Sequence, residues 1–387
     1  MRRGWVWLAA VCLLLGGCTG KGGQRAEEAP AAPEGLTMEL EHGVYDPSLT
    51  TYTYMIRNDT DETVEFGEPY SIQRKDGEGW TDLTMKDNAG WTAIGYALAP
   101  GQAMALSCGF ANYEETPRVG EYRLVKTVGG AQLTAEFSLG ESPYTARTPY
   151  GFVPLEELPE DYSAADAAAE DVVFSGAGAR NLDAVEAFLE KVSLGAPCQL
   201  RTVQDYGQSA VMVIDVIFEG GPFLWRMRSN GAVAEQRLAF LVTDGENLYL
   251  SSCADWETGE QYGDKRVFLV PENTALSDRA LSLASEMMHR QLESGTVRLQ
   301  VWSPDGVWSA GVTAQPGELA LSYQGASGSA GCIWDISELD SRAVQVQGLS
   351  WQADNVLRLD CRTETGNTFR MTLDTGTLAG LLDVPTA

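Results

Sequence analysis

The chain has 387 residues, of which 54 are Asp or Glu and 27 are Lys or Arg, so its formal net charge at pH 7 is −27. Nucleic acid and anionic lipid headgroups repel so acidic a chain, which excludes a nucleic-acid-binding protein and a basic membrane-binding patch. The length predicts two or three domains. After the first twenty residues, no apolar run reaches the roughly 18 residues of a membrane span.

The first twenty residues, MRRGWVWLAAVCLLLGGCTG, have the layout of a secretory signal, with two arginines before a short apolar run. The LGGC motif that ends at Cys18 resembles the bacterial lipobox, in which small residues precede the cysteine that receives diacylglycerol. The resemblance implies a signal peptide at residues 1–17, cleavage between Gly17 and Cys18, and lipidation of Cys18. The alternative is an ordinary secretory signal that happens to contain this cysteine.

Residues 18–36 are rich in Gly, Pro, Ala and charge without periodicity, and this composition predicts a flexible, lipidated tether. Bacterial lipoproteins carry two or three acyl chains, such as palmitate, which anchor them stably. We therefore expect the protein on the outer face of the cytoplasmic membrane of a Gram-positive bacterium. Its partner there would be the membrane itself, reached through the N-terminal lipid.

Residues 37–140 alternate apolar and polar positions in short segments that turn residues separate, which predicts a β-sandwich. Four pieces occur in the order typical of one family: Asn58-Asp59-Thr60, Gly67-x-x-Tyr70, Pro100-Gly101 and Gly120-Glu121-Tyr122-Arg123. On these residues the segment resembles the bacterial immunoglobulin-like domain common in lipoproteins of Clostridia and Bacilli. The resemblance implies a non-catalytic immunoglobulin-like sandwich, with Trp80, Trp91 and Tyr122 in its core or on its sheet faces.

Residues 141–168 are dense in Pro and acidic side chains and predict a linker. The stretch DVVFSGAGARNLDAVEAFLEKV follows, and it reads as a strand, a Gly turn and a helix. We expect Asn181 to cap this helix, Val185, Phe188 and Leu189 to supply its apolar face, and Gly195 to end it. The strands that follow predict an α+β domain over residues 169–275, with one helix on an antiparallel sheet.

This central segment resembles an uncharacterised domain of bacterial lipoproteins, domain-of-unknown-function family 4362. The residues that carry the resemblance are Asp171-Val172-Val173, Asn181, Phe188, Val192, Gly195, Arg201, Gly207 and Asp215. The resemblance implies architecture and location only. A nucleotide cofactor is not expected, because Gly176-Ala177-Gly178 is followed by Asn181 where the dinucleotide fingerprint has its third Gly.

Residues 276–387 begin with a second amphipathic pattern at 277–293, which Ser277 caps and Gly295 ends. Alternating segments and turns such as Pro304-Asp305-Gly306 follow, and they predict a β-meander or a small β-sandwich. The fold class expected for the whole chain is therefore mainly β.

Five of the seven cysteines remain once Cys12 leaves with the signal and Cys18 is lipidated. An extracytoplasmic setting allows disulfides, and we predict the pairs Cys198–Cys253 and Cys332–Cys361, with Cys108 left as a small buried hydrophobe. With two histidines and no C-x-x-C, a metal site is not expected. His42 would lie in a sandwich strand and His289 on a helix, so neither forms part of a catalytic triad.

No catalytic residue and no cofactor is therefore predicted, and the expected function is a non-catalytic binding or adaptor module of the cell envelope. The sandwich would present its edges and loops to an envelope protein or glycan. One alternative is an envelope hydrolase that uses paired carboxylates. Another is a peptidase-inhibitor or sensor role for the immunoglobulin-like sandwich.

Overall fold

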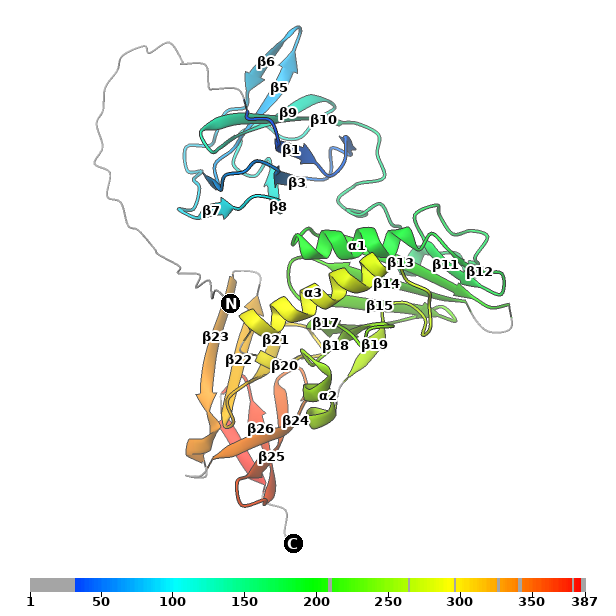
Figure 1. Ribbon diagram of the computed structural model, residues 1–387, viewed down its shortest axis with the longest axis vertical. Coiled ribbons are helices and arrows are strands. Elements are labelled where there is room, and N and C mark those ends of the chain that lie inside the picture. The colour runs from blue at the N-terminus through cyan, green and yellow to red at the C-terminus, as the bar shows by residue number, and fades with distance from the viewer. Residues whose placement is uncertain are drawn as a thin grey trace, which may run out of the picture.

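The computed structural model describes residues 32–207, 211–263, 265–295, 297–325, 328–339, 343–377 and 379–383. The signal peptide, Gly17, Cys18 and most of the predicted tether lie outside the described residues. Figure 1 shows an N-terminal β-structure, a central sheet covered by two long helices, and a C-terminal β-structure. The chain is mainly β, as the sequence predicts. Among the described helices, none is long and apolar enough to cross a membrane.

The N-terminal part is a two-sheet sandwich in which β1–β3–β8 form one sheet and β2–β10–β9–β5–β6 form the other, with β4 and β7 paired separately. All pairs are antiparallel except β10 with β2. The strands are β1 (Leu36–Leu40), β2 (Val44–Tyr45), β3 (Thr51–Asn58), β4 (Val64–Gly67), β5 (Ser71–Asp76), β6 (Gly79–Asp82), β7 (Gly95–Leu98), β8 (Gln102–Gly109), β9 (Gly120–Val128) and β10 (Ala131–Leu139).

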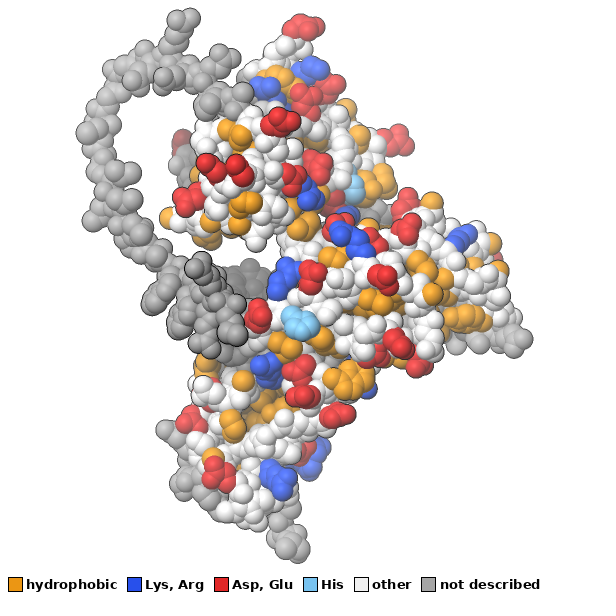
Figure 2. Space-filling view, in the orientation of Figure 1, with side chains coloured by type: hydrophobic (Ala, Val, Ile, Leu, Met, Phe, Trp, Pro, Cys, Tyr) orange, Lys and Arg blue, Asp and Glu red, His pale blue; other side chains and the backbone are white. Residues whose placement is uncertain are grey.

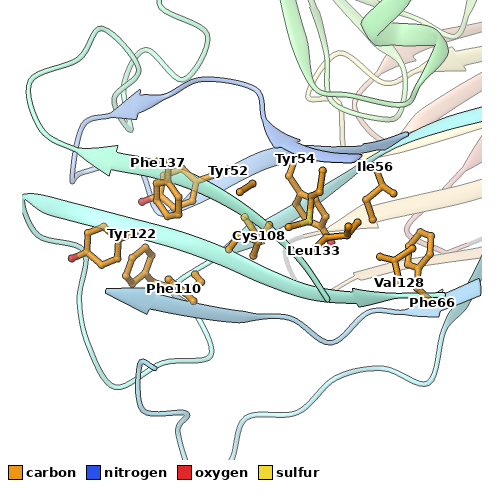
Figure 3. Packing of buried hydrophobic residues seen from close by; sticks show 14 of the residues in the cluster. Tyr52, Tyr54, Ile56, Phe66, Cys108, Phe110, Tyr122, Val128, Leu133 and Phe137 are labelled. Atoms are coloured by element: carbon orange, nitrogen blue, oxygen red, sulfur yellow. The ribbon is translucent and has the colours of Figure 1, made fainter. Parts of the chain in front are cut away.

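Aromatic side chains fill the core of this sandwich, as Figure 3 shows for Tyr52, Phe110, Tyr122 and Phe137. Cys108 lies among them as a buried free thiol, which agrees with its predicted role as a small hydrophobe. The hydroxyl of Tyr122 donates to the backbone carbonyl four residues upstream at 3.0 Å. A tyrosine that fixes the chain in this way is a hallmark of immunoglobulin-like sandwiches.

The central sheet has the strand order β12–β11–β13–β14–β15–β16. Its strands are β11 (Val172–Ser175), β12 (Gly178–Arg180), β13 (Cys198–Asp205), β14 (Met212–Phe218), β15 (Phe223–Ser229) and β16 (Ala232–Leu238). β11 and β13 are parallel, whereas the prediction was an antiparallel sheet throughout. The difference arises because β12 folds back on β11 as a hairpin, and α1 (Asp183–Ser193) then returns the chain alongside β11.

Two corrections concern the start of α1. Gly176 and Ala177 form the turn of the β11–β12 hairpin, rather than a turn from strand to helix. Asn181 does not cap the helix, because its own backbone is left-handed with φ of 59°. Its side-chain amide instead donates to the carbonyls of Ala169 and Asp171, at 2.9 and 3.3 Å. Asn181 therefore fastens the hairpin to the chain that leads into β11.

α1 packs on β13 of the central sheet, and α3 (Asp278–Ser294) lies beside α1 and packs on β17 (Phe240–Thr243) of a small neighbouring sheet (Figure 1). Ser277 caps α3 by accepting a hydrogen bond from the Ala280 amide, as the sequence predicts. The buried side chains of α3 pack with those of α1 in one core that includes Val185 and Ala284. This helix therefore packs in the central core, although its place in the sequence predicted that it would belong with the C-terminal strands.

A small sheet, α2 (Trp256–Tyr262) and a sandwich of two four-stranded meanders complete the molecule, and the meanders share one core. The sandwich agrees with the prediction. The remaining strands are β17 (Phe240–Thr243), β18 (Leu248–Ser251), β19 (Arg266–Phe268), β20 (Val297–Trp302), β21 (Trp308–Thr313), β22 (Glu318–Gly325), β23 (Gly328–Asp335), β24 (Val344–Ala353), β25 (Val356–Thr363), β26 (Thr368–Asp374) and β27 (Ala379–Asp383).

Neither predicted disulfide is formed in the structure. Cys198 is a buried free thiol in the central core beneath α1, whereas Cys253 packs in the C-terminal core. Cys332 is exposed on β23, and Cys361 is a free thiol buried in the C-terminal core. The predicted pairing rested on shared segments of sequence. In space, one pair is divided between two cores and the other between a surface and a core.

Candidate functional site

The face of the central sheet turned away from the helices carries a row of alternating charges. Arg201 on β13 is directly opposite Asp215 on β14, and both are almost fully buried. Arg201 Nε and Nη2 each donate to the Asp215 carboxylate at 2.7 Å. Next along the row, Arg226 Nε donates to Glu235 at 3.3 Å. Opposite charges in cross-strand pairs stabilise a sheet, so these residues serve the fold first.

The sequence predicts a linker over residues 141–168. Its first residues contact the Ig-like domain, and residues 150–168, which we call the strap, pack across this face of the sheet. Leu155, in η1 (Leu155–Glu157), is buried against Val203 and Val213 of the sheet. Arginines of the sheet hold the strap: Arg201 Nη2 donates to Val153 O (2.7 Å), Arg226 pairs with Glu156, and Arg228 Nη2 donates to Leu158 O (3.0 Å) and Pro159 O (2.8 Å). Three of the cations on this face are thus occupied by the strap.

Two cavities adjoin one another beside the strap. The larger, of about 440 Å³, lies between the strap residues Tyr150 and Phe152 and the sheet. The smaller, of about 190 Å³, lies between β16 and the C-terminal sandwich, where Trp302 and Trp351 line it. Arg237 on β16 lines both cavities. We call the two cavities together the Arg237 groove.

Arg237 differs from the other arginines of this face because no hydrogen bond or ion pair joins its side chain to any described residue. Gly306 makes room for its guanidinium, since a Cβ at that position would lie 2.2 Å from Arg237 Nη1. Gly306 belongs to the Pro304-Asp305-Gly306 turn, where its positive φ of 70° also suits glycine. The turn of the C-terminal sandwich therefore holds an unpaired cation at the edge of the groove.

The carboxylates that line the larger cavity already have partners. Asp215 is bound by Arg201, and Glu219 accepts a hydrogen bond from the Tyr150 hydroxyl at 3.2 Å. Burial, reinforced by the Glu219 charge, raises the pKa of Tyr150 well above its usual range. The cavity therefore presents bound carboxylates, aromatic rings and a cation rather than a pair of free acids.

One carboxyl with a shifted pKa, Asp171, lies near the strap but outside the lining of both cavities. Burial raises its pKa although the Arg201 charge opposes this. Its Oδ2 accepts from the Tyr162 hydroxyl at 3.0 Å, and its buried Oδ1 has no partner among the described residues. Burial and the same contact raise the pKa of Tyr162 to about 12. Asp171 thus fastens the strap to the start of β11.

The immunoglobulin-like sandwich contacts the central part through α1. Lys191 Nζ lies 2.7 Å from the Glu41 carboxylate, and the Ala105 amide of β8 donates to the Leu194 carbonyl at 3.3 Å. The carbonyls at the end of a helix lack partners within the helix. The amide on the edge of the sandwich and the carbonyl at the end of the helix therefore pair with each other.

The two histidines take no part in the groove. His42 lies in the loop between β1 and β2, not in a strand as predicted, because the chain bends there and its ring stacks on Tyr144 at 3.5 Å. Burial lowers the pKa of His42. His289 is exposed on α3, where its Nδ1 lies 2.7 Å from the Ser285 carbonyl. Within the described ranges, no three His, Cys, Asp or Glu side chains come together as a metal site.

The Arg237 groove has almost no signature in the sequence. Arg237 is one of 27 basic residues, and nothing in its neighbourhood along the chain distinguishes it. The one local signal is the turn at Pro304-Asp305-Gly306, which by itself indicates only a connection between strands. Figure 2 shows acidic side chains spread over every part of the visible face, in keeping with the net charge of −27. Arg237 stands out because it lacks a partner and also lines two cavities, and only the structure reveals that combination.

The chain is similar to solved structures only at low scores. The archaellum periplasmic stator protein FlaG from Sulfolobus acidocaldarius is 13% identical, over 26% of this chain and 99% of that one, with a TM-score of 0.19. The periplasmic gluconolactonase PpgL of Pseudomonas aeruginosa is 11% identical over 81% of each chain, with a TM-score of 0.20. Scores this low carry no argument about fold or activity.

No curated protein matches this chain. A family model does match, and its description is bacterial Ig-like domain, over residues 32–138. The match covers the sandwich that the structure forms from β1 to β10 and the segment that carried the predicted resemblance. The N-terminal part of this chain is therefore a bacterial Ig-like domain.

Proposed function

We propose that this protein is a non-catalytic binding module of the cell envelope, anchored outside the cytoplasmic membrane by lipid on Cys18, with the Arg237 groove as its ligand site. The presence of a bacterial Ig-like domain supports a binding or adaptor role. The observation that carries the proposal is the unpaired Arg237 in a groove with aromatic walls, on a sheet face whose other arginines are paired and hold the strap. Ligand sites typically combine apolar walls with a few convergent polar groups.

The disposition of carboxylates supports binding rather than hydrolysis. Glycosidases place two carboxyl groups on either side of the scissile bond, one of them with a raised pKa. In the larger cavity, Asp215 and Glu219 are each held by another side chain. Asp171, whose pKa is raised, is a strap contact outside the cavities. The hydrolase alternative therefore has no pair of acids in the groove to use.

The similarity of the segment from Asp171 to Asp215 to domain-of-unknown-function family 4362 stays a prediction, as do the domain boundaries. It is consistent with an envelope protein and supplies no ligand. The lipid anchor is likewise a proposal that rests on the LGGC motif ending at Cys18.

A pull-down from crosslinked membranes of a Gram-positive host tests the binding role. The bait is the full chain, and the control is residues 1–36 fused to an unrelated folded domain. We expect an envelope glycan or protein to be enriched over the anchor control and to be depleted when the bait carries Arg237→Gln. Equal recovery with bait and anchor control would contradict the proposal, and so would release of sugar from purified envelope glycans by the full chain.

The anchor is tested separately by Cys18→Ala. We expect the wild-type chain in the detergent phase after phase separation and the variant in the aqueous phase. Recovery of both proteins in the aqueous phase would contradict lipidation while leaving the binding role open to the pull-down.

A further inference from the structure

The smaller cavity of the Arg237 groove is rich in hydrogen-bond donors. Arg237 and Lys265 line it, together with the indole rings of Trp302 and Trp351. Glu235 is the single acidic residue of its lining, and Arg226 already binds that carboxylate at 3.3 Å. In a chain of net charge −27, this cavity therefore carries two cations against one neutralised acid.

Three of these donors are unused. Neither Arg237 nor the Lys265 ammonium makes a hydrogen bond or ion pair with a described residue. The Trp302 indole N–H is buried and has no partner among the described residues, whereas the neighbouring Trp351 N–H donates to the Val301 carbonyl at 3.2 Å. A buried donor without a partner costs about 1–3 kcal/mol, so native proteins seldom keep one without a use. Arg237 and Lys265 thus line the same cavity without an acceptor of their own among the described residues.

One acid outside the lining, Asp305, is close enough to be influenced by the Arg237 charge. Asp305 accepts hydrogen bonds from the Ser303 hydroxyl at 2.5 Å and from the Val307 amide at 3.0 Å. Those bonds, with a smaller contribution from the Arg237 charge, lower the pKa of Asp305. Its carboxylate forms no ion pair with Arg237. The Arg237 guanidinium thus lies close to a turn in which the Asp305 carboxylate is already hydrogen-bonded to other groups.

Deepening the function proposed above, on which this inference rests, we propose that the smaller cavity binds the phosphate group of a phosphorylated sugar. An arginine fork and an ammonium together offer more N–H donors than the two oxygens of a carboxylate can use, and a phosphate monoester has three terminal oxygens. Arginine suits phosphate because its planar fork binds two oxygens at once. The rings of Trp302 and Trp351 offer flat apolar surfaces to the carbon face of a sugar.

The larger cavity offers space for the rest of such a ligand. It begins on the other side of Arg237, has a volume of about 440 Å³, and is walled by Tyr150 and Phe152 of the strap. A phosphate held at Arg237 can therefore carry a sugar that extends either between the tryptophans or under the strap. The cation between the two cavities is the fixed point of recognition in both poses.

Calorimetric titration of the full purified chain tests this inference with four probes: inorganic phosphate, glucose 6-phosphate, glucuronate and glucose. We expect glucose 6-phosphate to bind most tightly, inorganic phosphate more weakly, and glucose not at all. Arg237→Gln is expected to weaken binding of glucose 6-phosphate by about tenfold or more, the size of a lost charge-assisted contact. Lys265→Gln, which removes the second cation of the lining, is expected to weaken it about threefold to tenfold.

Arg57→Gln provides the matched control, because it removes the same charge from an exposed position on β3 of the Ig-like domain. It should leave binding unchanged. Binding of glucuronate as tight as that of glucose 6-phosphate would overturn the phosphate assignment. The assignment is also overturned if no phosphate probe binds, or if Arg57→Gln weakens binding as much as Arg237→Gln does. Should the pull-down still enrich a partner in those cases, only this inference falls.

Discussion

Two cations, Lys126 in the Ig-like domain and Arg237 in the groove, differ in whether the protein supplies acceptors for their N–H groups. Lys126 is 1% exposed, and its ammonium donates to three backbone carbonyls, those of Gly67, Glu68 and Pro69, at 2.8–3.2 Å. Arg237 is half-buried and donates to no described residue. A buried cation whose donors are satisfied internally belongs to the architecture. A cation left without acceptors beside a cavity points to a ligand, and substitutions of Arg201, Lys126 and Arg237 test this division.

The largest effect is expected from Arg201→Met, which leaves Asp215 buried without its partner. Breaking a buried ion pair from one side costs about 3–5 kcal/mol of unfolding free energy, because an uncompensated charge stays inside. Differential scanning calorimetry of the variant measures this loss. The double variant Arg201→Met with Asp215→Leu should recover most of it, since a well-packed apolar pair is often neutral. A loss below about 1 kcal/mol in the single variant would contradict a structural role for the pair.

Lys126→Met should destabilise the Ig-like domain by about 1–3 kcal/mol, because three buried carbonyls lose their donor. Burial lowers the pKa of Lys126 from 10.5 to about 8. Between these two values the unfolded chain binds more protons than the folded one, so this group makes stability rise as the pH increases from about 8 to 10.5.

The pH dependence is read from the difference between wild type and Lys126→Met, because the buried tyrosines titrate in both proteins and cancel. We expect the wild-type advantage to grow over that pH range in urea unfolding monitored by tryptophan fluorescence. A difference that stays constant or shrinks would show that Lys126 does not titrate as a buried cation.

A smaller loss, of about 1–2 kcal/mol, is expected from Asn181→Ala. Alanine is disfavoured at the left-handed φ of 59°, and it lacks the amide that binds the carbonyls of Ala169 and Asp171. Asn181→Gly isolates the two causes, since glycine accepts this backbone and loses only the hydrogen bonds. Thermal unfolding should therefore rank wild type above Gly and Gly above Ala. Equal stability of the two variants would remove the backbone from the explanation.

The smallest effect on folding is expected from Arg237→Gln, which should change the unfolding free energy by no more than about 0.5 kcal/mol. The substitution removes no hydrogen bond or ion pair from the folded state, because the Arg237 side chain makes none with a described residue. The same thermal melt that registers Arg201→Met should leave this variant close to wild type, while its ligand binding falls. A marked destabilisation would place Arg237 with the architectural cations and break the comparison.

The parts that could be predicted from the sequence depend on near neighbours. Alternation and turn residues predicted the Ig-like sandwich, and Ser277 at the head of an apolar periodicity predicted the start of α3. The failures involve distant partners. Asn181 has the residue type of a cap, yet its amide binds carbonyls ten and twelve residues upstream. Cys198 and Cys253 lie 55 positions apart in the sequence and in separate cores.

The groove was the least predictable feature, because it is defined by an arginine side chain that makes no hydrogen bond or ion pair with a described residue. Arg226 and Arg237 are similar in sequence terms, both flanked by strand residues. Only the structure distinguishes the arginine that holds Glu156 from the one that faces an open cavity. Likewise the strap has the composition of a linker, and its packing depends on arginines that lie more than 40 residues further along the chain.

The hydrogen bond from Ala105 to Leu194 has a consequence for solubility. β8 is an edge of its sheet, and an exposed edge is a template for pairing with another chain. Here the residue that follows α1 occupies one of its outward amides. The Ig-like domain cut free of the central part would expose that amide, and the edge would be more open to pairing with another copy. The end of the helix thus shields part of this edge from pairing with another chain.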